Sequence, residues 1–126
     1  MRFTQTFEIT QWDQNQYDET GKIQLGRATV GKTFTGGDLE GTSSAQLLMA
    51  ATADGPAAYT AVERFVGTLA GRAGSFVMVH GATADQTSSP GKIVAADGDL
   101  AGLTGTVVYE HDEQGPRVTV DYELPW

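Results

Sequence analysis

Glu63 and His80 are the two side chains of this sequence whose types and positions best suit acid–base chemistry. A hairpin turn centred between Gly71 and Arg72 would set Glu63 directly opposite His80 on two adjacent strands. Desolvation raises the pKa of a carboxyl group in an apolar interior, while a neighbouring imidazolium lowers it. Such a coupled pair can act as general base and general acid on a small ligand.

The same turn predicts which other side chains surround the pair. Alternate residues of a strand share one face of a sheet, so four further residues are expected beside Glu63 and His80 as a ligand-binding lining. These residues are Tyr59, Phe65, Phe76 and Met78. The opposite face would carry Val62, Val66, Val77 and Val79, an apolar surface suited to a homodimer contact.

A polar row is expected to continue from the pair across two more strands. An Asp54-Gly55 turn sets Gln46 opposite Glu63, and a Gly36-Gly37 turn sets Arg27 opposite Gln46. The expected ligand-binding residues therefore include Gln46 and Arg27. A single β-bulge would reverse the faces of a strand and remove either residue from the row.

Two other interpretations of Glu63 and His80 remain open. On the outside of the sheet they would form a solvated cross-strand pair worth a few tenths of a kcal/mol. In a fully packed interior they would form a buried structural hydrogen bond. Neither interpretation involves a ligand.

Other motifs for catalysis or cofactor binding are weak. His80 and His111 have no metal-ligand spacing, there is no cysteine, and His111 is expected to be solvated beside a turn. Gly71-Arg72-Ala73-Gly74 lacks the lysine and the strand–loop–helix setting of a phosphate loop. Ser75 has no Gly-x-Ser-x-Gly elbow around it. The sequence thus predicts neither a metal nor a cofactor.

Short strands separated by turn residues must position these side chains. Candidate strands cover residues 3–12, 22–34, 39–51, 57–69, 74–83, 92–97, 103–111 and 116–124. Eight antiparallel strands remove their edges most simply by closing, so the expected fold is an all-β, closed eight-stranded barrel formed by one domain, residues 1–126. Trp12 and Trp126 are expected to plug a barrel mouth or to cover a subunit contact.

A Gly-x-Leu-x-Gly element occurs three times, at intervals of about 30 residues. Its central residues are Leu39, Leu69 and Leu100. Two strands and their turns occupy a period of this size, so each copy is interpreted as a recurrent strand–turn element whose leucine caps one end of the core.

Composition restricts the partners. Sixteen acidic residues against eight basic ones give a net charge of -8, and the basic residues are scattered, so no nucleic-acid partner and no membrane partner are expected. The first ten residues alternate polar and apolar, unlike a signal peptide, and the longest apolar run, 47–51, is too short to span a bilayer. Without cysteines, the expected location is the cytoplasm.

Nearly the whole chain resembles an uncharacterised bacterial family known as domain of unknown function number 3224, and the central stretch is the most specific part of the match. The resemblance rests on the pattern Tyr59-x-x-x-Glu63-Arg64-x-x-Gly67-x-Leu69-x-Gly71-Arg72-x-Gly74-Ser75-Phe76-x-x-x-His80, preceded by Lys32-Thr33-Phe34-Thr35-Gly36 and followed by Leu100-Ala101-Gly102-Leu103-x-Gly105. Members of that family resemble the allene oxide cyclase barrel, which implies an eight-stranded fold. Plant allene oxide cyclases close a ring in an apolar lumen without a cofactor, but likeness of fold does not transmit chemistry.

Three functions follow as hypotheses. The first is a barrel whose lumen binds a small apolar or weakly polar molecule, oriented by Tyr59, Glu63 and His80. The second is a cofactor-free cyclase or isomerase, with Glu63 as base or electrostatic stabiliser of a developing cation and His80 as proton donor. The third is a structural or oligomeric module with a filled core.

Overall fold

A computed structural model describes residues 1–125, and among them the chain forms only strands and connecting turns. The nine strands make one antiparallel sheet in the order β1-β9-β8-β7-β6-β5-β4-β3-β2. Their bounds are β1 Arg2–Thr6, β2 Glu8–Asp18, β3 Gln24–Phe34, β4 Leu39–Thr52, β5 Gly55–Leu69, β6 Arg72–Thr83, β7 Ser89–Gly98, β8 Thr104–Asp112 and β9 Gly115–Glu123. All-β structure is therefore confirmed.

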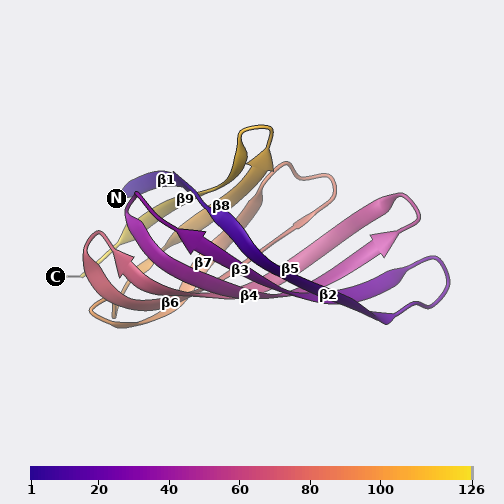
Figure 1. The fold of residues 1–126 in the computed structure, drawn as a ribbon, viewed down its shortest axis with the longest axis horizontal. Coiled ribbons are helices and arrows are strands. Elements are labelled where there is room, and N and C mark those ends of the chain that lie inside the picture. Colours follow the sequence, from indigo (N-terminus) through magenta and orange to yellow (C-terminus); the bar gives the residue numbers. More distant parts are fainter. Residues whose placement is uncertain (126) are drawn as a thin grey trace.

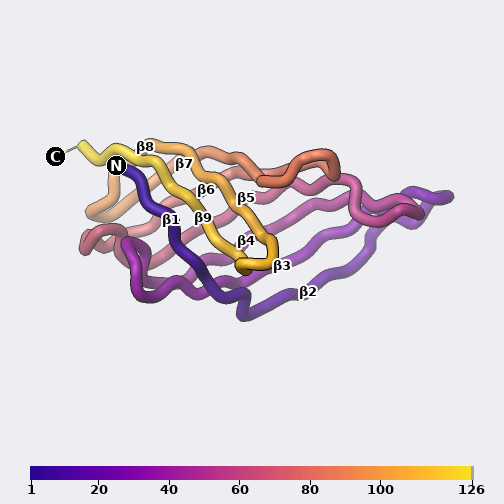
Figure 2. The backbone as a smooth tube through the Cα atoms, turned by 90° about the horizontal axis from the view of Figure 1, so that it is seen from above, coloured from indigo at the N-terminus to yellow at the C-terminus, as the bar shows by residue number. Residues whose placement is uncertain are grey.

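The sheet curls into a half-barrel, so the expectation of a closed eight-stranded barrel is wrong (Figures 1 and 2). The expected strand 3–12 breaks at Phe7 into β1, which pairs with β9, and β2, which pairs with β3. The β8–β9 hairpin turns between Asp112 and Gly115, and next to this turn the carbonyl of Pro116 accepts the backbone N–H of Phe7 at 3.3 Å. Beyond that point β2 pairs with β3 alone, and this half of the molecule stays open.

Phe7 joins the two edges of the sheet from inside. Its ring lies 5.1 Å from the ring of Phe34 on β3 and 5.6 Å from that of Tyr109 on β8, centroid to centroid. An aromatic side chain at the break therefore packs against strands from both sides of the curl. This packing accounts for the change of partner from β9 to β3.

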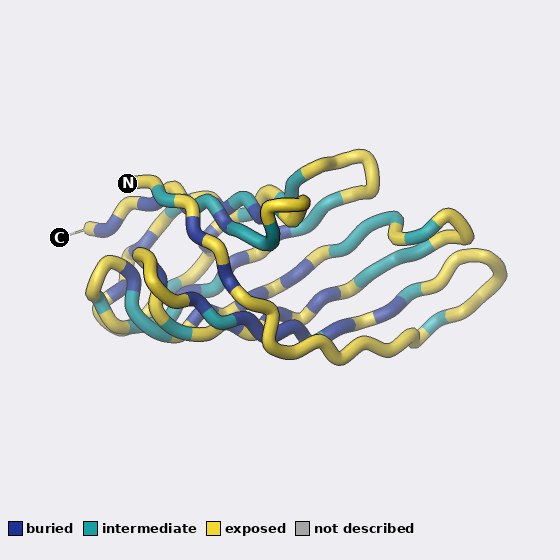
Figure 3. Tube along the Cα trace, turned by 45° about the horizontal axis from the view of Figure 1, so that its top comes forward, coloured by how far each residue is buried: buried dark blue, intermediate teal, exposed yellow. Residues whose placement is uncertain are grey.

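Two apolar clusters fill the inside of the curl. The larger one contains the aromatic rings of Phe34, Phe65 and Phe76 and lies toward the end where β1 pairs with β9. The smaller one consists mainly of small and aliphatic residues, Ala28, Val30, Ala45, Leu47 and Ala61. Figure 3 shows the tube exposed along β2 and the β2–β3 turn, whereas buried residues alternate with exposed ones along the inner strands such as β3 and β5.

The three leucines of the repeated element lie in the larger cluster, as expected for core residues at one end of the sheet. Leu39 begins β4 and pairs with Leu69 at the end of β5. Next to them Gly41 faces Gly67, where a Cβ on Gly67 would lie 2.1 Å from the carbonyl oxygen of Glu40. The two strands approach each other so closely that only glycine fits at this point.

The β5–β6 turn is centred one residue earlier than expected. Leu69 pairs with Arg72, so the turn residues are Ala70 and Gly71, both with positive φ, as in a type I′ hairpin. The shift moves the pairing by two residues, so that Glu63 lies opposite Met78 and His80 opposite Ala61. Because side chains alternate with a period of two, every residue of β5 and β6 keeps its expected face.

The β4–β5 connection, in contrast, reverses a face. The turn lies at Ala53 and Asp54, and Ala57 forms a bulge, because Ala50 pairs with Ala58 and Ala51 with Pro56. Gln46 consequently lies opposite Val62 and is exposed on the outside, so its expected pairing with Glu63 is wrong. Because the bulge adds one residue, it changes which of the two alternating sets of β4 side chains points inward.

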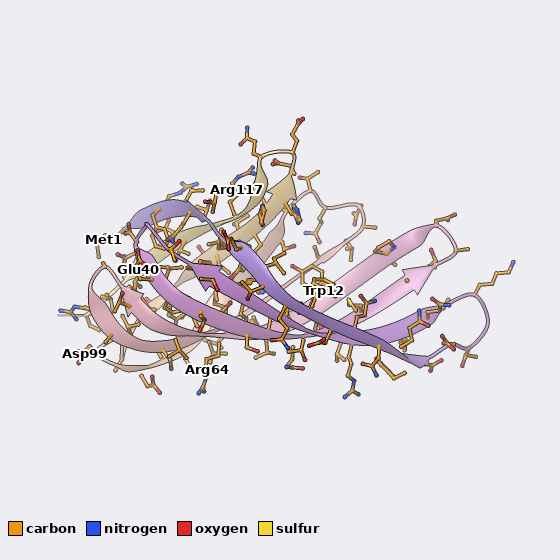
Figure 4. All side chains as sticks on the ribbon, in the orientation of Figure 1. Met1, Trp12, Glu40, Arg64, Asp99 and Arg117 are labelled. Carbon is orange, nitrogen blue, oxygen red and sulfur yellow. The ribbon has the colours of Figure 1, made fainter. Side chains whose placement is uncertain are left out.

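The outer face carries the apolar row expected opposite the site. Val62, Val66 and Val79 are 56%, 53% and 38% exposed, and Arg64 points away from the inside of the curl (Figure 4). A homodimer contact on this face stays a prediction. No helix that could cross a membrane is present in residues 1–125.

Candidate functional site

A row of four buried polar side chains crosses the inside of the sheet. Lys32 on β3, Ser43 on β4, Glu63 on β5 and His80 on β6 belong to four neighbouring strands and are 7%, 6%, 0% and 7% exposed. We call these residues the buried polar row. Along β3 and β5 the row separates the clusters: Phe34 and Phe65 lie on one side, Val30 and Ala61 on the other.

Glu63 is the centre of the row. Its Oε1 accepts hydrogen bonds from Nζ of Lys32 at 3.0 Å and from Nε2 of His80 at 2.7 Å, and its Oε2 accepts one from the Ser43 hydroxyl at 2.5 Å. In residues 1–125 every buried side-chain nitrogen and oxygen has a hydrogen-bond partner. A buried charge requires such complete pairing.

The three donors keep Glu63 ionised. Burial alone would raise its pKa, but the His80 hydrogen bond, the charge of Lys32 and the Ser43 hydrogen bond outweigh burial and lower the pKa from 4.5 to about 2. The carboxylate is therefore ionised at neutral pH.

His80 links the carboxylate to Tyr59. An ionised Glu63 accepts a hydrogen from Nε2, so in the neutral ring Nδ1 is the acceptor, and it lies 3.1 Å from the Tyr59 hydroxyl oxygen. Glu63, His80 and Tyr59 form a chain in which the hydroxyl can pass its proton to an imidazole that a carboxylate orients. Burial raises the pKa of Tyr59, which keeps the phenol protonated.

Lys32 lies among aromatic rings. Its Nζ is 4.0 Å from the ring centroid of Tyr109 and 5.1 Å from that of Phe7, and the His80 ring packs on Tyr109 at 4.5 Å. Burial lowers the pKa of Lys32 more than the charge of Glu63 raises it. Burial, with the charge of Glu63, raises the pKa of Tyr109 well above its usual value.

A cavity of about 530 Å³ lies next to the buried polar row. Its volume is within the range of small-molecule binding sites. Lys32, Tyr59, His80 and Tyr109 lie in its wall, while Glu63 is not part of the wall and lies behind Lys32 and His80. The rest is largely apolar, with Val30, Leu47, Met49 and a series of small residues: Ala50, Ala51, Ala57, Ala58, Ala82 and Ala84. The open half of the curl thus forms an apolar trough with a polar inner end.

Of the residues predicted for the site, the structure brings Tyr59, Glu63 and His80 together. Phe65, Phe76 and Met78 share the inner face as expected, but they are buried in the larger apolar cluster and do not line the cavity. These three residues belong to the packed core on the side of the row away from the cavity.

Gln46 and Arg27 lie on the outer face, so the expectation that they belong to the inward polar row is wrong. The bulge at Ala57 turns Gln46 outward, and Arg27 follows because it pairs with Leu48, also an outward residue of β4. There Gln46 accepts a hydrogen bond from Thr29, and Arg27 lies 5.5 Å from the Tyr17 ring centroid. The row does cross four strands, but with Ser43 and Lys32 as its members on β4 and β3.

Sequence reasoning missed Lys32, Ser43 and Tyr109 as site residues. The alternation Ala28, Val30, Lys32, Phe34 carries one signal, because a lysine at a position that otherwise holds apolar inward residues requires a buried partner. Tyr109 gives no comparable signal, because its pairing with Val118 in the β8–β9 hairpin does not reveal that its ring reaches Lys32.

The rim of the cavity contains two further residues of interest. Trp12 is 52% exposed and lines the opening, whereas Trp126 lies outside the described residues. His111 is exposed, and it also belongs to the rim. Within residues 1–125, no three histidine, cysteine, aspartate or glutamate side chains are grouped so that they could hold a metal ion.

Comparison with known proteins gives a family and a structural relative. The family model described as "Protein of unknown function (DUF3224)" matches residues 3–124. A crystal structure of a protein of unknown function from the DUF3224 family of Shewanella oneidensis MR-1 aligns with 30% sequence identity and a TM-score of 0.83, covering 100% of this chain and 98% of that one. The search of curated proteins gave no match. These comparisons do not confirm the likeness to allene oxide cyclases. They show that the chain belongs to the DUF3224 family of proteins of unknown function.

Proposed function

We propose that the protein binds a small, mostly apolar molecule that has one polar group. The observation that carries the proposal is the combination of an apolar cavity of about 530 Å³ with Lys32, Tyr59 and His80 at its inner end. The apolar part of the ligand would lie against the alanines and Leu47, and its polar group would accept or donate hydrogen bonds at the row.

The energetics of the row also support a functional role. A buried ion pair is often no more stabilising than well-packed apolar residues of the same volume. Stability alone therefore does not explain why Lys32 and Glu63 form a buried ion pair here. The row lies where the packed core meets the open trough, the place where a ligand would reach it. Ligand binding would explain why charged residues occupy these buried positions, whereas core packing alone does not.

A substitution that fills the cavity tests the binding proposal. We expect some members of a panel of small apolar alcohols, ketones and acids to raise the melting temperature, since a ligand at 100 times its Kd stabilises by about 2.7 kcal/mol. Ala82→Trp should weaken binding at least tenfold, because residue 82 lines the cavity. Titration of the melting shift measures both effects.

Ala95→Trp is the matched control, because Ala95 is exposed on β7 and does not line the cavity. It should bind the same ligands as the unchanged protein. A panel without a single stabilising compound, or equal affinity in Ala82→Trp and Ala95→Trp, would contradict the proposal.

A second candidate function, a cofactor-free isomerase, is favoured by the Glu63–His80–Tyr59 chain of hydrogen bonds. Tyr59 would take a proton from a carbon next to a carbonyl group while its own proton passes to Nδ1 of His80. The imidazolium so formed would be paired with Glu63, and the proton would return to another carbon. Glu63 acts here through His80, as a positioning residue, rather than on the substrate.

Conversion of an apolar β,γ-unsaturated ketone into its conjugated isomer would measure this activity by ultraviolet absorbance. We expect Tyr59→Phe to lower the rate at least tenfold, because the phenylalanine ring keeps the packing but has no proton to transfer. Tyr17→Phe is the control, since Tyr17 is 48% exposed and lies outside the cavity wall. Equal rates in the two variants would reject the role of Tyr59.

A further inference from the structure

Lys32 differs from the other lysines of the chain. Lys22 and Lys92 are exposed, whereas Lys32 is 7% exposed and lies in the cavity wall. A primary amine at the inner end of an apolar cavity is placed to meet the polar end of a bound molecule.

Three groups surround the Lys32 amine. Oε1 of Glu63 accepts its hydrogen bond at 3.0 Å, and the rings of Tyr109 and Phe7 lie 4.0 and 5.1 Å from Nζ. These groups suit a planar cation as well as an ammonium, because the rings present their π-faces to the charge and the carboxylate neutralises it. An iminium ion on Nζ would therefore keep the electrostatic partners of the lysine.

We propose that Lys32 forms an imine with apolar aldehydes that enter the cavity. This inference rests on the proposed function, because it requires the cavity to hold a small apolar molecule. It goes further by naming the ligand class, an aldehyde, and the atom that would bind it covalently, Nζ of Lys32.

The step balances without an oxidant or reductant. The ammonium first releases a proton to water, and the free amine attacks the carbonyl carbon. An N–C bond forms, the C=O π bond breaks, and a proton moves from nitrogen to the former carbonyl oxygen, which gives a neutral carbinolamine. A proton then returns as the carbinolamine oxygen leaves as water, which gives the iminium ion. One positive charge is present before and after the reaction, so Glu63 is the counter-ion of both the ammonium and the iminium ion.

The surroundings favour both formation and survival of the imine. Burial lowers the pKa of Lys32, which raises the share of free amine at neutral pH above that of an exposed lysine. The low exposure of the side chain limits the access of water, which would hydrolyse the imine.

Reductive trapping tests the proposal. The intact protein is incubated at pH 7 with 3-phenylpropanal and sodium cyanoborohydride, which reduces an iminium to a stable amine. Peptide mapping by mass spectrometry should show Lys32 carrying the mass of the aldehyde less one oxygen, at a rate at least tenfold above Lys22 and Lys92. Lys32→Arg keeps the charge beside Glu63 but cannot form an imine, so this variant should lose the fast-forming adduct.

The matching alcohol, 3-phenylpropan-1-ol, separates failure of the inference from failure of the proposed function. If the alcohol raises the melting temperature but Lys32 reacts no faster than Lys22 and Lys92, imine formation is rejected and binding stands. If the alcohol and the aldehyde both leave the melting temperature unchanged and Lys32 is unmodified, both proposals are overturned. Fast modification of Lys32 in the unchanged protein supports the inference even if Lys32→Arg does not fold.

Discussion

Replacing Glu63 with glutamine should lower the free energy of unfolding by about 3–5 kcal/mol at pH 7. The amide keeps the size of the side chain but removes the charge that neutralises Lys32 at 3.0 Å. A buried ammonium without a counter-ion must remain charged at high cost or lose its proton. Urea denaturation with linear extrapolation measures the difference.

A double variant, Glu63→Gln with Lys32→Met, should recover most of the lost stability. It leaves no buried charge from the pair, and a double-mutant cycle gives the coupling between the two residues. Glu110→Gln is the surface control. This substitution removes a 3.4 Å contact between the Glu110 carboxylate and Arg117. Because the Glu110 side chain is 36% exposed, the expected loss of stability is below about 1 kcal/mol. Similar losses in Glu63→Gln and Glu110→Gln would contradict the role given to the buried polar row.

Acid should destabilise the folded protein through the same carboxylate, by about 3 kcal/mol between pH 4.5 and about 2. The folded-state pKa of Glu63 lies below its unfolded value, so between these pH values the unfolded chain binds more protons. The stabilisation is therefore complete above pH 4.5 and is lost as the pH falls through the folded-state pKa. Each pH unit in this window lowers the free energy of unfolding by at most about 1.4 kcal/mol.

The contribution of Glu63 can be isolated by comparison with the double variant Glu63→Gln, Lys32→Met. Other carboxylates also titrate in this window, including Asp112, which Arg117 holds at a pKa of about 2. They are present in both proteins, so the difference between the two curves of stability against pH reports the buried pair. If the two curves run parallel down to pH 2, Glu63 is not held ionised in the way described.

The Glu63 carboxylate connects these stability effects to the proposed functions. It orients His80 through Nε2 and neutralises Lys32, and of the four residues of the buried polar row only His80 and Lys32 reach the cavity. Chemistry on a ligand would therefore take place at Tyr59, His80 and Lys32. Separate readouts are available, because Tyr59→Phe tests proton transfer and Lys32→Arg tests imine formation.

Much of the local structure could be predicted from the residues. Turn signals located the seven strands from β3 to β9 but merged β1 with the start of β2. The hairpin between Leu69 and Arg72 placed Glu63 and His80 on one face, although its centre was misjudged. The error did no harm because it moved the pairing by two residues, and side chains repeat with that period. The element around Leu39, Leu69 and Leu100 likewise indicated core positions correctly.

The sequence by itself determined an all-β chain and brought Glu63 and His80 to the same side of adjacent strands, because local turns and a period of two are enough for that. Only the tertiary structure decided the rest. Because of the bulge at Ala57, Ser43 and Lys32 lie in the row in place of the expected Gln46 and Arg27, since one extra residue reverses the face of a strand. The break at Phe7 left the sheet open, because the partner of a strand depends on contacts between distant segments rather than on its own residues.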